Sequence, residues 1–270
     1  MSRSGRKSAA SSTPDLARAG NGKPRCYGLI RCSHEDSRQS GLGLDNQTER
    51  IKRWYELIKL DHPDLEWGGL FKDEVVPTWG LDEAGHRQLF TVDQTIRPET
   101  NPEVLAKLSP AFNPKGGLVT AGNSSPLTVG ASALLMMSEE RAKELGLTPK
   151  VKIRSMAVAG VEPCEMGIGP AKATPKALER SGVSIDDIDA IELNEAFASQ
   201  SLAVIRLANF DPDKVNTRGG AIALGHPLGS SGARIVVTLI HRMTQDGNKL
   251  GLATLCVGGG MGEATIVEAC

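Results

Sequence analysis

The chain has 270 residues, of which 40% are hydrophobic, and its formal net charge at pH 7 is −1. This length allows one large domain or two small ones, and the near-zero charge provides no overall field for nucleic acid or a membrane surface. No apolar run is long enough to span a bilayer. The five cysteines are odd in number and scattered, which favours a reducing compartment over a disulfide framework. The five histidines lack the spacing partners of a zinc site, so we expect no metal.

Residues 1–25 are basic and rich in Ser, Ala and Gly. They contain a single acidic residue, Asp15. Their basic residues are Arg3, Arg6, Lys7, Arg18, Lys23 and Arg25. We expect a disordered tail. A nucleic-acid-binding arm and an organelle transit peptide are the alternatives, since transit peptides are also rich in Arg and Ser and poor in acids. We expect a cytoplasmic protein, and organelle targeting by the tail is left open.

Strand and helix patterns alternate after the tail. In the first half we expect a strand at 26–32 and then a polar loop at 33–43. A helix follows, capped by Asp45 or Asn46 and ended by His62-Pro63. A strand at 70–76 and a loop at 109–130 come next. A helix is expected from about Gly130 to Leu145, stopped by Gly146 and Pro149.

The second half continues the alternation. We expect a strand at 151–159, a helix opened by Thr174-Pro175 and stopped by Gly182, a strand at 185–193, a helix through Ala208, a helix at 229–243, and strands at 250–257 and 263–269. Alternating strands and helices predict an α/β layered fold.

Three blocks hold the residues most suited to chemistry. The first runs from Asn194 to Phe197, the second is the Gly-rich stretch 216–234 around His226, and the third is Cys256-Val-Gly-Gly-Gly-Met-Gly. A histidine titrates near neutrality, and glycine amides can approach a developing oxyanion without side-chain clashes. The residues alone also allow plain structural roles: a loop histidine, a buried core cysteine and a helix-capping asparagine.

The three blocks, in this order and spacing, resemble the thiolase family, specifically the degradative 3-ketoacyl-CoA thiolases and acetyl-CoA acetyltransferases. The resemblance covers residues from about 71 to 270 and includes further blocks, namely Phe71-Lys-Asp-Glu-Val-Val-Pro, Ile96-Arg-Pro, Leu105-Ala-Lys-Leu, Thr120-Ala-Gly-Asn-Ser-Ser and Gly169-Pro. It implies a thiolase-like layered αβα C-terminal domain with part of the loop domain. It also implies acyl transfer in which a nucleophilic cysteine accepts the acyl group of a 3-ketoacyl-CoA and coenzyme A removes it, with coenzyme A as substrate and no cofactor.

The resemblance also implies roles for individual residues. His226 matches the histidine that activates the nucleophile and holds a thioester oxygen, and Cys256 matches the cysteine that exchanges a proton with the acetyl carbon. Asn194 matches the residue that holds a water in the first oxyanion hole, and the Gly258 amide matches a donor of the second. Ser125 matches a serine near the pantetheine arm, although a turn residue would explain it equally well.

The sequence departs from the thiolase pattern in two places. The nucleophilic cysteine has no recognisable counterpart, since Cys26 and Cys32 are the only cysteines upstream and neither stands in the expected Ser/Gly setting. Val129 occupies a position where the family usually has an acid. Full activity is therefore not expected of this chain alone. A truncated thiolase would expose apolar surface, which predicts a homo-oligomer or a partner chain.

Residues 26–70 resemble instead the start of a serine recombinase catalytic domain, a short βα fragment. The resemblance rests on Tyr27-Gly-Leu-Ile-Arg-Cys-Ser and on the block at 40–47, and it implies a DNA-attacking role for Ser33 and a phosphate contact for Arg31. A strand-capping hydroxyl is the structural alternative for Ser33. The chain then divides into a tail (1–25), a resolvase-like fragment (26–70), a thiolase loop-domain remnant with a linking helix (71–145) and a thiolase C-terminal domain (146–270). A chimera of this kind leaves two alternative functions: a DNA-binding fragment, although nucleic-acid binding is not favoured, and a non-catalytic binder of coenzyme A.

Overall fold

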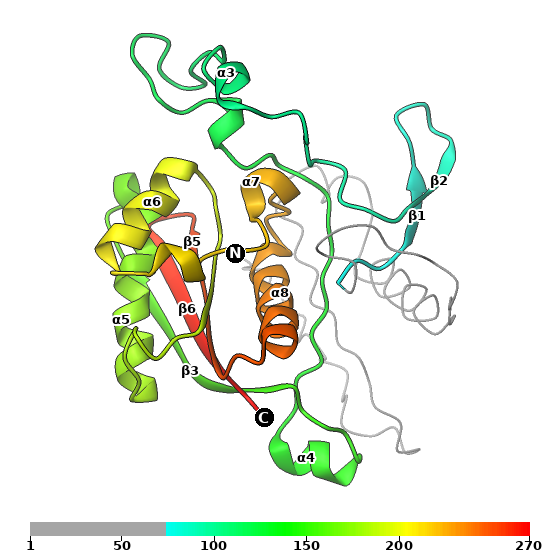
Figure 1. Ribbon diagram of the computed structural model, residues 1–270, viewed down its shortest axis with the longest axis vertical. Helices are drawn as coiled ribbons and strands as arrows, with labels where there is room; N and C mark the ends of the chain where they lie inside the picture. Colours follow the sequence, from blue (N-terminus) through cyan, green and yellow to red (C-terminus); the bar gives the residue numbers. More distant parts are fainter. Residues whose placement is uncertain (1–73) are drawn as a thin grey trace, which may run out of the picture.

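Figure 1 shows a computed structural model, which describes residues 74–270. The strand and helix expected between residues 26 and 63, together with Arg31 and Ser33, lie outside the described residues. No described helix is both long enough and apolar enough to cross a membrane.

The centre of the structure is a four-stranded mixed sheet with the order β3-β6-β5-β4. Its strands are β3 (Val151–Gly160), β4 (Ala190–Leu193), β5 (Leu250–Val257) and β6 (Met261–Ala269). β6 pairs antiparallel with both β3 and β5, whereas β4 and β5 are parallel. Parallel neighbours need a long crossover, and here three helices supply it: α6 (Ala198–Leu207), α7 (Ala221–Leu224) and α8 (Ser231–Asp246).

Helices cover both faces of this sheet (Figure 1). On one face α5 (Gly169–Ser181) packs through Ala173 and Ala177 against the larger hydrophobic core. On the other face α8 packs through Ile235, Leu239 and Met243 in a second core cluster. This arrangement confirms the predicted layered αβα fold, because each face of the sheet is buried by its own amphipathic helix.

Most of the remaining described elements lie between residues 78 and 168. They are β1 (Thr78–Leu81), β2 (Arg87–Phe90), α3 (Pro102–Leu105), the 3-10 turns Ala121–Asn123 and Pro163–Ile168, and α4 (Glu139–Glu144). A further 3-10 turn, Pro212–Lys214, follows α6. β1 and β2 form an antiparallel hairpin, closed where Asp82 Oδ1 accepts from Ala84 N and His86 N.

Several boundaries agree closely with the sequence. β5 has the predicted bounds, β3 extends one residue beyond its predicted end, and α6 ends within a residue of Ala208. Gly182 ends α5 with φ 69°, the left-handed conformation that glycine adopts at helix C-termini without strain.

The helix predicted from Gly130 to Leu145 is wrong over its first half. Residues 130–137 contain no regular structure, and α4 begins only after Ser138, whose side chain accepts from Arg141 N at 3.2 Å. The Ser138 cap and the acids Glu139 and Glu140 favour a helix start here, because they satisfy free amides and interact with the helix dipole.

Three other boundaries were also predicted wrongly. The described end of the predicted 70–76 strand is irregular; the first strand starts at Thr78, just after Pro77, which has no amide to donate. α5 begins five residues before Thr174, so Pro175 lies inside the helix, where close burial of its neighbours outweighs the lost hydrogen bond. β4 covers only the end of the predicted 185–193 strand, since Ser184 N and Oγ both bind Asp187 Oδ2 in a turn.

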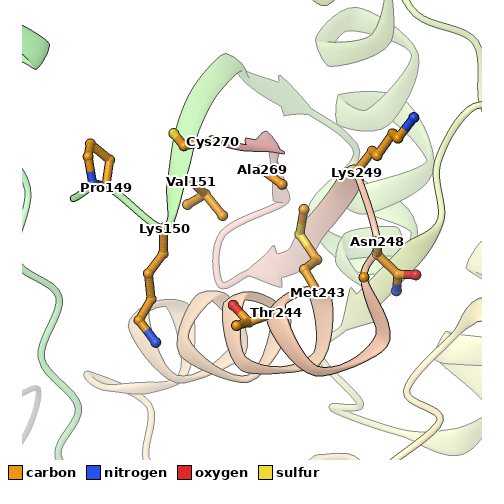
Figure 2. A pocket seen from close by; sticks show the side chains of 10 residues that line it. Pro149, Lys150, Val151, Met243, Thr244, Asn248, Lys249, Ala269 and Cys270 are labelled. Carbon is orange, nitrogen blue, oxygen red and sulfur yellow. The ribbon is translucent and has the colours of Figure 1, made fainter.

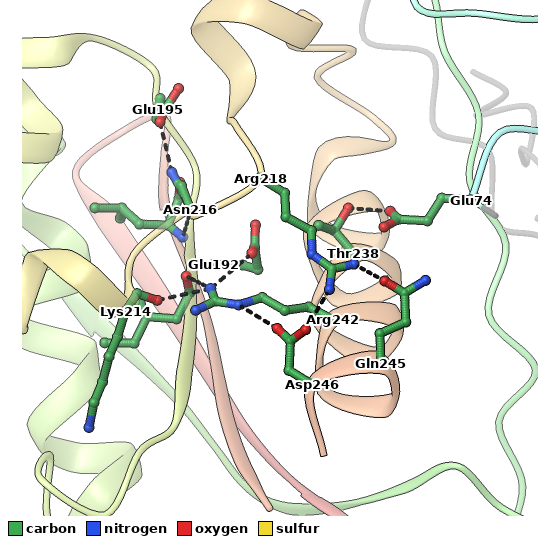
Figure 3. Close-up of polar contacts among 12 residues, drawn as sticks. Glu74, Glu192, Glu195, Lys214, Asn216, Arg218, Thr238, Arg242, Gln245 and Asp246 are labelled. Atoms are coloured by element: carbon green, nitrogen blue, oxygen red, sulfur yellow. Dashed lines mark hydrogen bonds and ion pairs between the residues drawn. The ribbon is translucent and has the colours of Figure 1, made fainter. Parts of the chain in front are cut away.

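A buried polar network fixes α8 against β4 (Figure 3). Arg242 Nη1 donates to the carbonyls of Lys214 at 2.9 Å and Ile191 at 3.3 Å, and lies 3.5 Å from Glu192 Oε1. Glu192 is only 1% exposed, and burial raises its pKa to about 7 despite the nearby charges of Arg234 and Arg242. The carboxyl group is therefore held near the midpoint of its titration at neutral pH.

Candidate active site

Two of the predicted site residues lie at the same edge of the sheet because β4 and β5 are parallel neighbours. Asn194 immediately follows β4, and its amide donates to Thr254 O in β5 at 3.0 Å. Cys256 lies two residues further along β5 and pairs with Gly262 of β6. Side chains at the carboxyl ends of adjacent parallel strands are the usual place for chemistry in an α/β sheet.

His226 reaches this edge from the loop between α7 and α8. Its backbone amide donates to Pro126 O at 2.9 Å, and Leu127 forms a parallel bridge with it. Gly225, with φ 101°, permits the sharp turn before the histidine, and a Cβ there would lie 2.5 Å from Thr128. The Gly-rich block therefore holds the backbone of His226 against the 126–128 segment.

Both ring nitrogens of His226 have partners. Nε2 lies 3.4 Å from Asn194 Nδ2, and Nδ1 lies 2.5 Å from Ser231 Oγ, which in turn donates to Pro227 O at 3.1 Å. Because the Ser231 hydroxyl proton points to Pro227, its oxygen is free to accept from Nδ1–H. That tautomer leaves the Nε2 lone pair facing Asn194 Nδ2, from which it can accept a hydrogen bond.

Burial sets the protonation of both acid/base candidates. It lowers the pKa of His226, with the charge of Arg234 acting in the same direction, so the imidazole is neutral at pH 7. It raises the pKa of the Cys256 thiol above its ordinary value. At neutral pH the pair thus consists of a neutral base and a protonated thiol, which can act as a proton donor.

The block that carries Asn194 is anchored by its next residue. Glu195 accepts from Asn216 Nδ2 at 2.8 Å and from Ile222 N at 3.1 Å, as Figure 3 shows in part. A Cβ at Gly220 would lie 2.2 Å from the Glu195 carboxyl carbon, so a larger residue there would displace the carboxylate from these partners. The carboxylate thereby ties the end of β4 to the Gly-rich loop that bears His226.

The buried backbone at the end of β4 is also paired. Asn216 Oδ1 accepts from Leu193 N at 2.8 Å, and Asn216 Nδ2 donates to Leu193 O at 2.7 Å. The sequence singled out Asn216 only as the start of a block, Glu195 only as a possible helix cap together with Asn194, and Ser231 was assigned no role. Their contacts are with residues distant in sequence or across a helix start, which no local pattern specifies.

Ser125 and Gly258 lie around the same edge. Ser125 binds Ala196 O through both its amide, at 3.0 Å, and its hydroxyl, at 3.1 Å, which places it beside the Asn194 block. Gly258 lies in the turn between β5 and β6, and its amide donates to no other described residue. Val129, where an acid was expected, is fully exposed.

The structure brings some predicted residues into contact and not others. Asn194 and His226 meet directly, whereas no hydrogen bond joins Cys256 Sγ to either of them. Asn194 Oδ1 is buried without a partner in the described part of the chain, which is compatible with a group that binds water. A cavity of about 340 Å³ lies at the opposite edge of the sheet, lined by Lys150, Met243 and Cys270 among others (Figure 2), and so contributes nothing to this arrangement.

Comparison with known proteins matches the chain to two family models. The model of the thiolase C-terminal domain matches residues 147–269, and that of the thiolase N-terminal domain matches residues 66–140. Among curated proteins, 3-ketoacyl-CoA thiolases of Marinobacter nauticus and Psychrobacter cryohalolentis are 59% and 57% identical over 203 and 202 residues. Each alignment covers 74% of this chain and 52% of the relative, so the chain spans about half the length of these relatives.

Solved structures give the same result. Human mitochondrial 3-ketoacyl-CoA thiolase is 43% identical with a TM-score of 0.69, covering 74% of this chain and 50% of that protein. The Bacillus anthracis acetyl-CoA acetyltransferase is 44% identical with a TM-score of 0.72, covering 87% of this chain and 58% of that one. With the fold, the sheet-edge residues and these matches in agreement, the chain belongs to the thiolase family.

Proposed function

We propose that this chain carries the proton-transfer and oxyanion-binding part of a thiolase site. The reaction is 3-ketoacyl-CoA plus CoA giving acyl-CoA plus acetyl-CoA, with coenzyme A as substrate and no separate cofactor. The observation that carries the proposal is the direct pairing of Asn194 with His226 at the sheet edge where Cys256 ends β5. The names of the relatives, all 3-ketoacyl-CoA thiolases or an acetyl-CoA acetyltransferase, support this substrate class.

In the proposed mechanism His226 takes the proton of an attacking thiol at Nε2. The resulting imidazolium donates to the thioester oxygen, next to a water held by Asn194. The deprotonated thiol adds to C3 of the ketoacyl group, and the free amide of Gly258 binds the oxyanion that forms there. When the bond between C2 and C3 breaks, the Cys256 thiol protonates the departing acetyl carbon, while the thioester oxygen, which carries the enolate charge, stays with His226 and the water held by Asn194. A pKa raised by burial suits Cys256 to this step, because the thiol keeps its proton until the carbanion develops.

Acyl transfer also needs a nucleophilic thiolate, which the described residues do not offer beside this site. Cys164 and Cys270 are exposed, and Cys26 and Cys32 lie outside the described residues. We therefore propose that the chain alone performs proton exchange on a bound thioester rather than complete thiolysis. Ser125, beside Ala196, is proposed to contact the pantetheine arm.

The proposal is tested by exchange of the C2 protons of acetyl-CoA in D₂O, followed by NMR. Exchange requires a base at C2 and a donor at the enolate oxygen, but no acyl-enzyme. Exchange above the buffer rate should fall to background in Cys256→Ser and at least tenfold in His226→Ala, and should persist in the control Cys164→Ser. Background exchange with the folded wild-type chain, or equal rates in Cys256→Ser, would refute the proposal. CoA affinity without exchange would indicate the non-catalytic binder instead.

Three further assignments remain proposals. The chain works in the cytoplasm, and it associates with a partner or with copies of itself that cover its exposed apolar side chains. The division into a tail, a recombinase-like fragment, a loop-domain remnant and a C-terminal domain is supported only where the family models match, at 66–140 and 147–269.

A further inference from the structure

A layer of polar side chains lies between α8 and the end of β4. The polar layer consists of residues from the helix, from the strand end and from position 74, namely Arg234, Thr238, Arg242, Glu192, Asn194 and Glu74. Thr238 Oγ1 donates to Glu74 Oε2 at 2.7 Å, as Figure 3 shows. The positive charge of Arg234 interacts with the carboxyl groups of Glu74 and Glu192. The three helical residues are four apart, so they lie on one side of α8.

Buried atoms without hydrogen-bond partners are concentrated in the polar layer. The described residues contain seven such side-chain atoms, and five of them belong to this layer, namely Asn194 Oδ1, Glu192 Oε2, Glu74 Oε1, Arg234 Nη1 and Arg242 Nε. Asn194 is fully buried, and Glu192 and Arg242 are only 1% and 4% exposed. An unpaired buried polar atom destabilises the folded state, the more so when it is charged. Five in one layer therefore indicate a ligand that supplies the missing hydrogen bonds.

The ion pairs inside the polar layer are also long. Arg242 Nη1 lies 3.5 Å from Glu192 Oε1, and Arg242 Nε lies 3.8 Å from Asp246 Oδ2. The same guanidinium donates to Lys214 O at 2.9 Å, so its position is set by backbone carbonyls rather than by the two carboxylates. Polar groups separated by more than about 3.5 Å are a usual place for a bridging water.

The unpaired atoms determine the chemical class of the ligand. Three are acceptors, on one amide and two carboxyl groups, and two are donors, on two guanidinium groups. A cation would lie against the guanidinium groups, and an anion would lie against the carboxyl groups. Water both donates and accepts, so it fits the whole set. Because a buried water makes about three hydrogen bonds, about two molecules are needed for the five atoms.

We propose that ordered water molecules fill the polar layer and form a hydrogen-bonded chain from Asn194, past Glu192, to Arg242. The first end lies at the active site, since Asn194 Nδ2 is 3.4 Å from His226 Nε2. The other end lies beside Asp246, whose side chain is 44% exposed, so the chain connects the site with the surface at the end of α8. Glu192 and Arg242 are then positioning residues, which orient the water at Asn194 through the waters between them. Only this positioning role rests on the proposed function.

A high-resolution crystal structure of the full chain tests the location of the waters. We expect ordered waters within hydrogen-bonding distance of Glu192 Oε2 and Arg242 Nε, joined by further hydrogen bonds to Asn194 Oδ1. Direct pairing of the carboxylate and guanidinium groups without water, or an ion in this place, would overturn the proposal. This measurement uses the wild type and therefore does not depend on the folding of a variant.

Oxygen-17 magnetic relaxation dispersion tests the same chain in solution, because it counts long-lived internal waters. Glu192→Leu removes an acceptor and should lower this count by about one or two. Glu192→Gln keeps a polar group of the same shape and should keep the count. Glu268→Leu is the matched control, since the same substitution at a partly exposed carboxylate on β6 should leave the count unchanged. Equal counts for Glu192→Leu and the wild type, or an equal loss in the control, would contradict the water chain.

The positioning role has a separate readout. In Glu192→Leu the rate of C2 exchange should fall about fivefold, whereas the affinity for acetyl-CoA should change less than about twofold, because the waters lie behind Asn194 rather than in contact with the ligand. Circular dichroism confirms that the variant is folded. An unchanged exchange rate in a variant that has lost its waters would refute the positioning role. Waters in the polar layer of a wild type that shows no C2 exchange would refute the proposed function and leave the water chain intact.

Discussion

Replacing Gly262 with Ala should force α5 away from the sheet. A Cβ at Gly262 would lie 2.0 Å from the carbonyl carbon of Gly169, at the start of α5, and 2.1 Å from its oxygen. In the reverse direction, a Cβ at Gly169 would lie 2.4 Å from Met261 O. Each glycine therefore allows the other's backbone to approach, and the atoms that must move belong to main chain rather than to a flexible side chain.

The magnitude follows from this distance. Ordinary contact begins near 3.4 Å, so the helix start must move by about 1.4 Å, the difference between 3.4 and 2.0 Å. Overpacking of a well-filled site costs about 1–3 kcal/mol, and a backbone clash belongs at the upper end of that range. For a domain of this size each kcal/mol lowers Tm by roughly 2–4 °C, so we expect a loss of about 6–12 °C. Cys256 pairs with Gly262, so C2 exchange should fall as well.

Urea denaturation followed by circular dichroism measures the change in free energy of unfolding. Gly160→Ala is the matched control, since Gly160 also lies at a strand end in the same sheet and a Cβ there meets nothing within 4 Å. It should change stability by less than about 0.5 kcal/mol. Equal stabilities for Gly262→Ala and Gly160→Ala would show that the helix start and β6 are not in close contact, and would refute the reasoning.

Three more predictions concern the buried groups. Burial raises the pKa of Glu192 from 4.5 to about 7, so its contribution to the free energy of unfolding is full below pH 4.5 and is lost as pH rises through 7. We expect the wild type to lose about 3 kcal/mol of stability between pH 4.5 and 8 for this reason, and Glu192→Gln not to show this loss. The difference between the urea-stability profiles of the two proteins over this pH range measures the effect. Ser231→Ala should slow C2 exchange about tenfold with acetyl-CoA affinity unchanged, because Nδ1 of His226 loses the partner that fixes its tautomer; an unchanged rate would remove Ser231 from the account. Arg234→Met should raise the pKa of His226, followed by NMR titration of its ring protons, and an unmoved or lower pKa would contradict the charge effect.

The pH dependence of C2 exchange gives a fifth test. In the exchange reaction the Cys256 thiolate must remove a proton from C2. Burial raises the pKa of the Cys256 thiol above 9.0, so little thiolate is present at neutral pH. The exchange rate should therefore still be rising at pH 9. A plateau near pH 7 would instead assign the base to a group such as His226.

The sequence predicted the layered fold and the residues of the sheet edge for different reasons. The strand and helix periodicities of β3, β5 and α8 are local, so the sequence predicts these elements without tertiary information. Asn194, His226 and Cys256 were singled out by their order and spacing, and the parallel pairing of β4 with β5 explains why distant blocks lie at one edge.

The errors arose where tertiary contacts decide the outcome. Residues 130–137 contain Ala, Leu and Met, which favour a helix by propensity, but they lack the polar face that a surface helix needs. Pro175 signals a helix start locally, yet burial of Thr174 and Ala177 carries the helix through it. Ser231, Glu195 and their partners act only after the chain has folded.

A crystal structure of the chain with acetyl-CoA tests the central claim most directly, because it locates the thioester. We predict the thioester oxygen within hydrogen-bonding distance of His226 Nε2 and the C2 carbon facing Cys256 Sγ. Acetyl-CoA bound at the opposite edge of the sheet, in the cavity beside Lys150, would contradict the account.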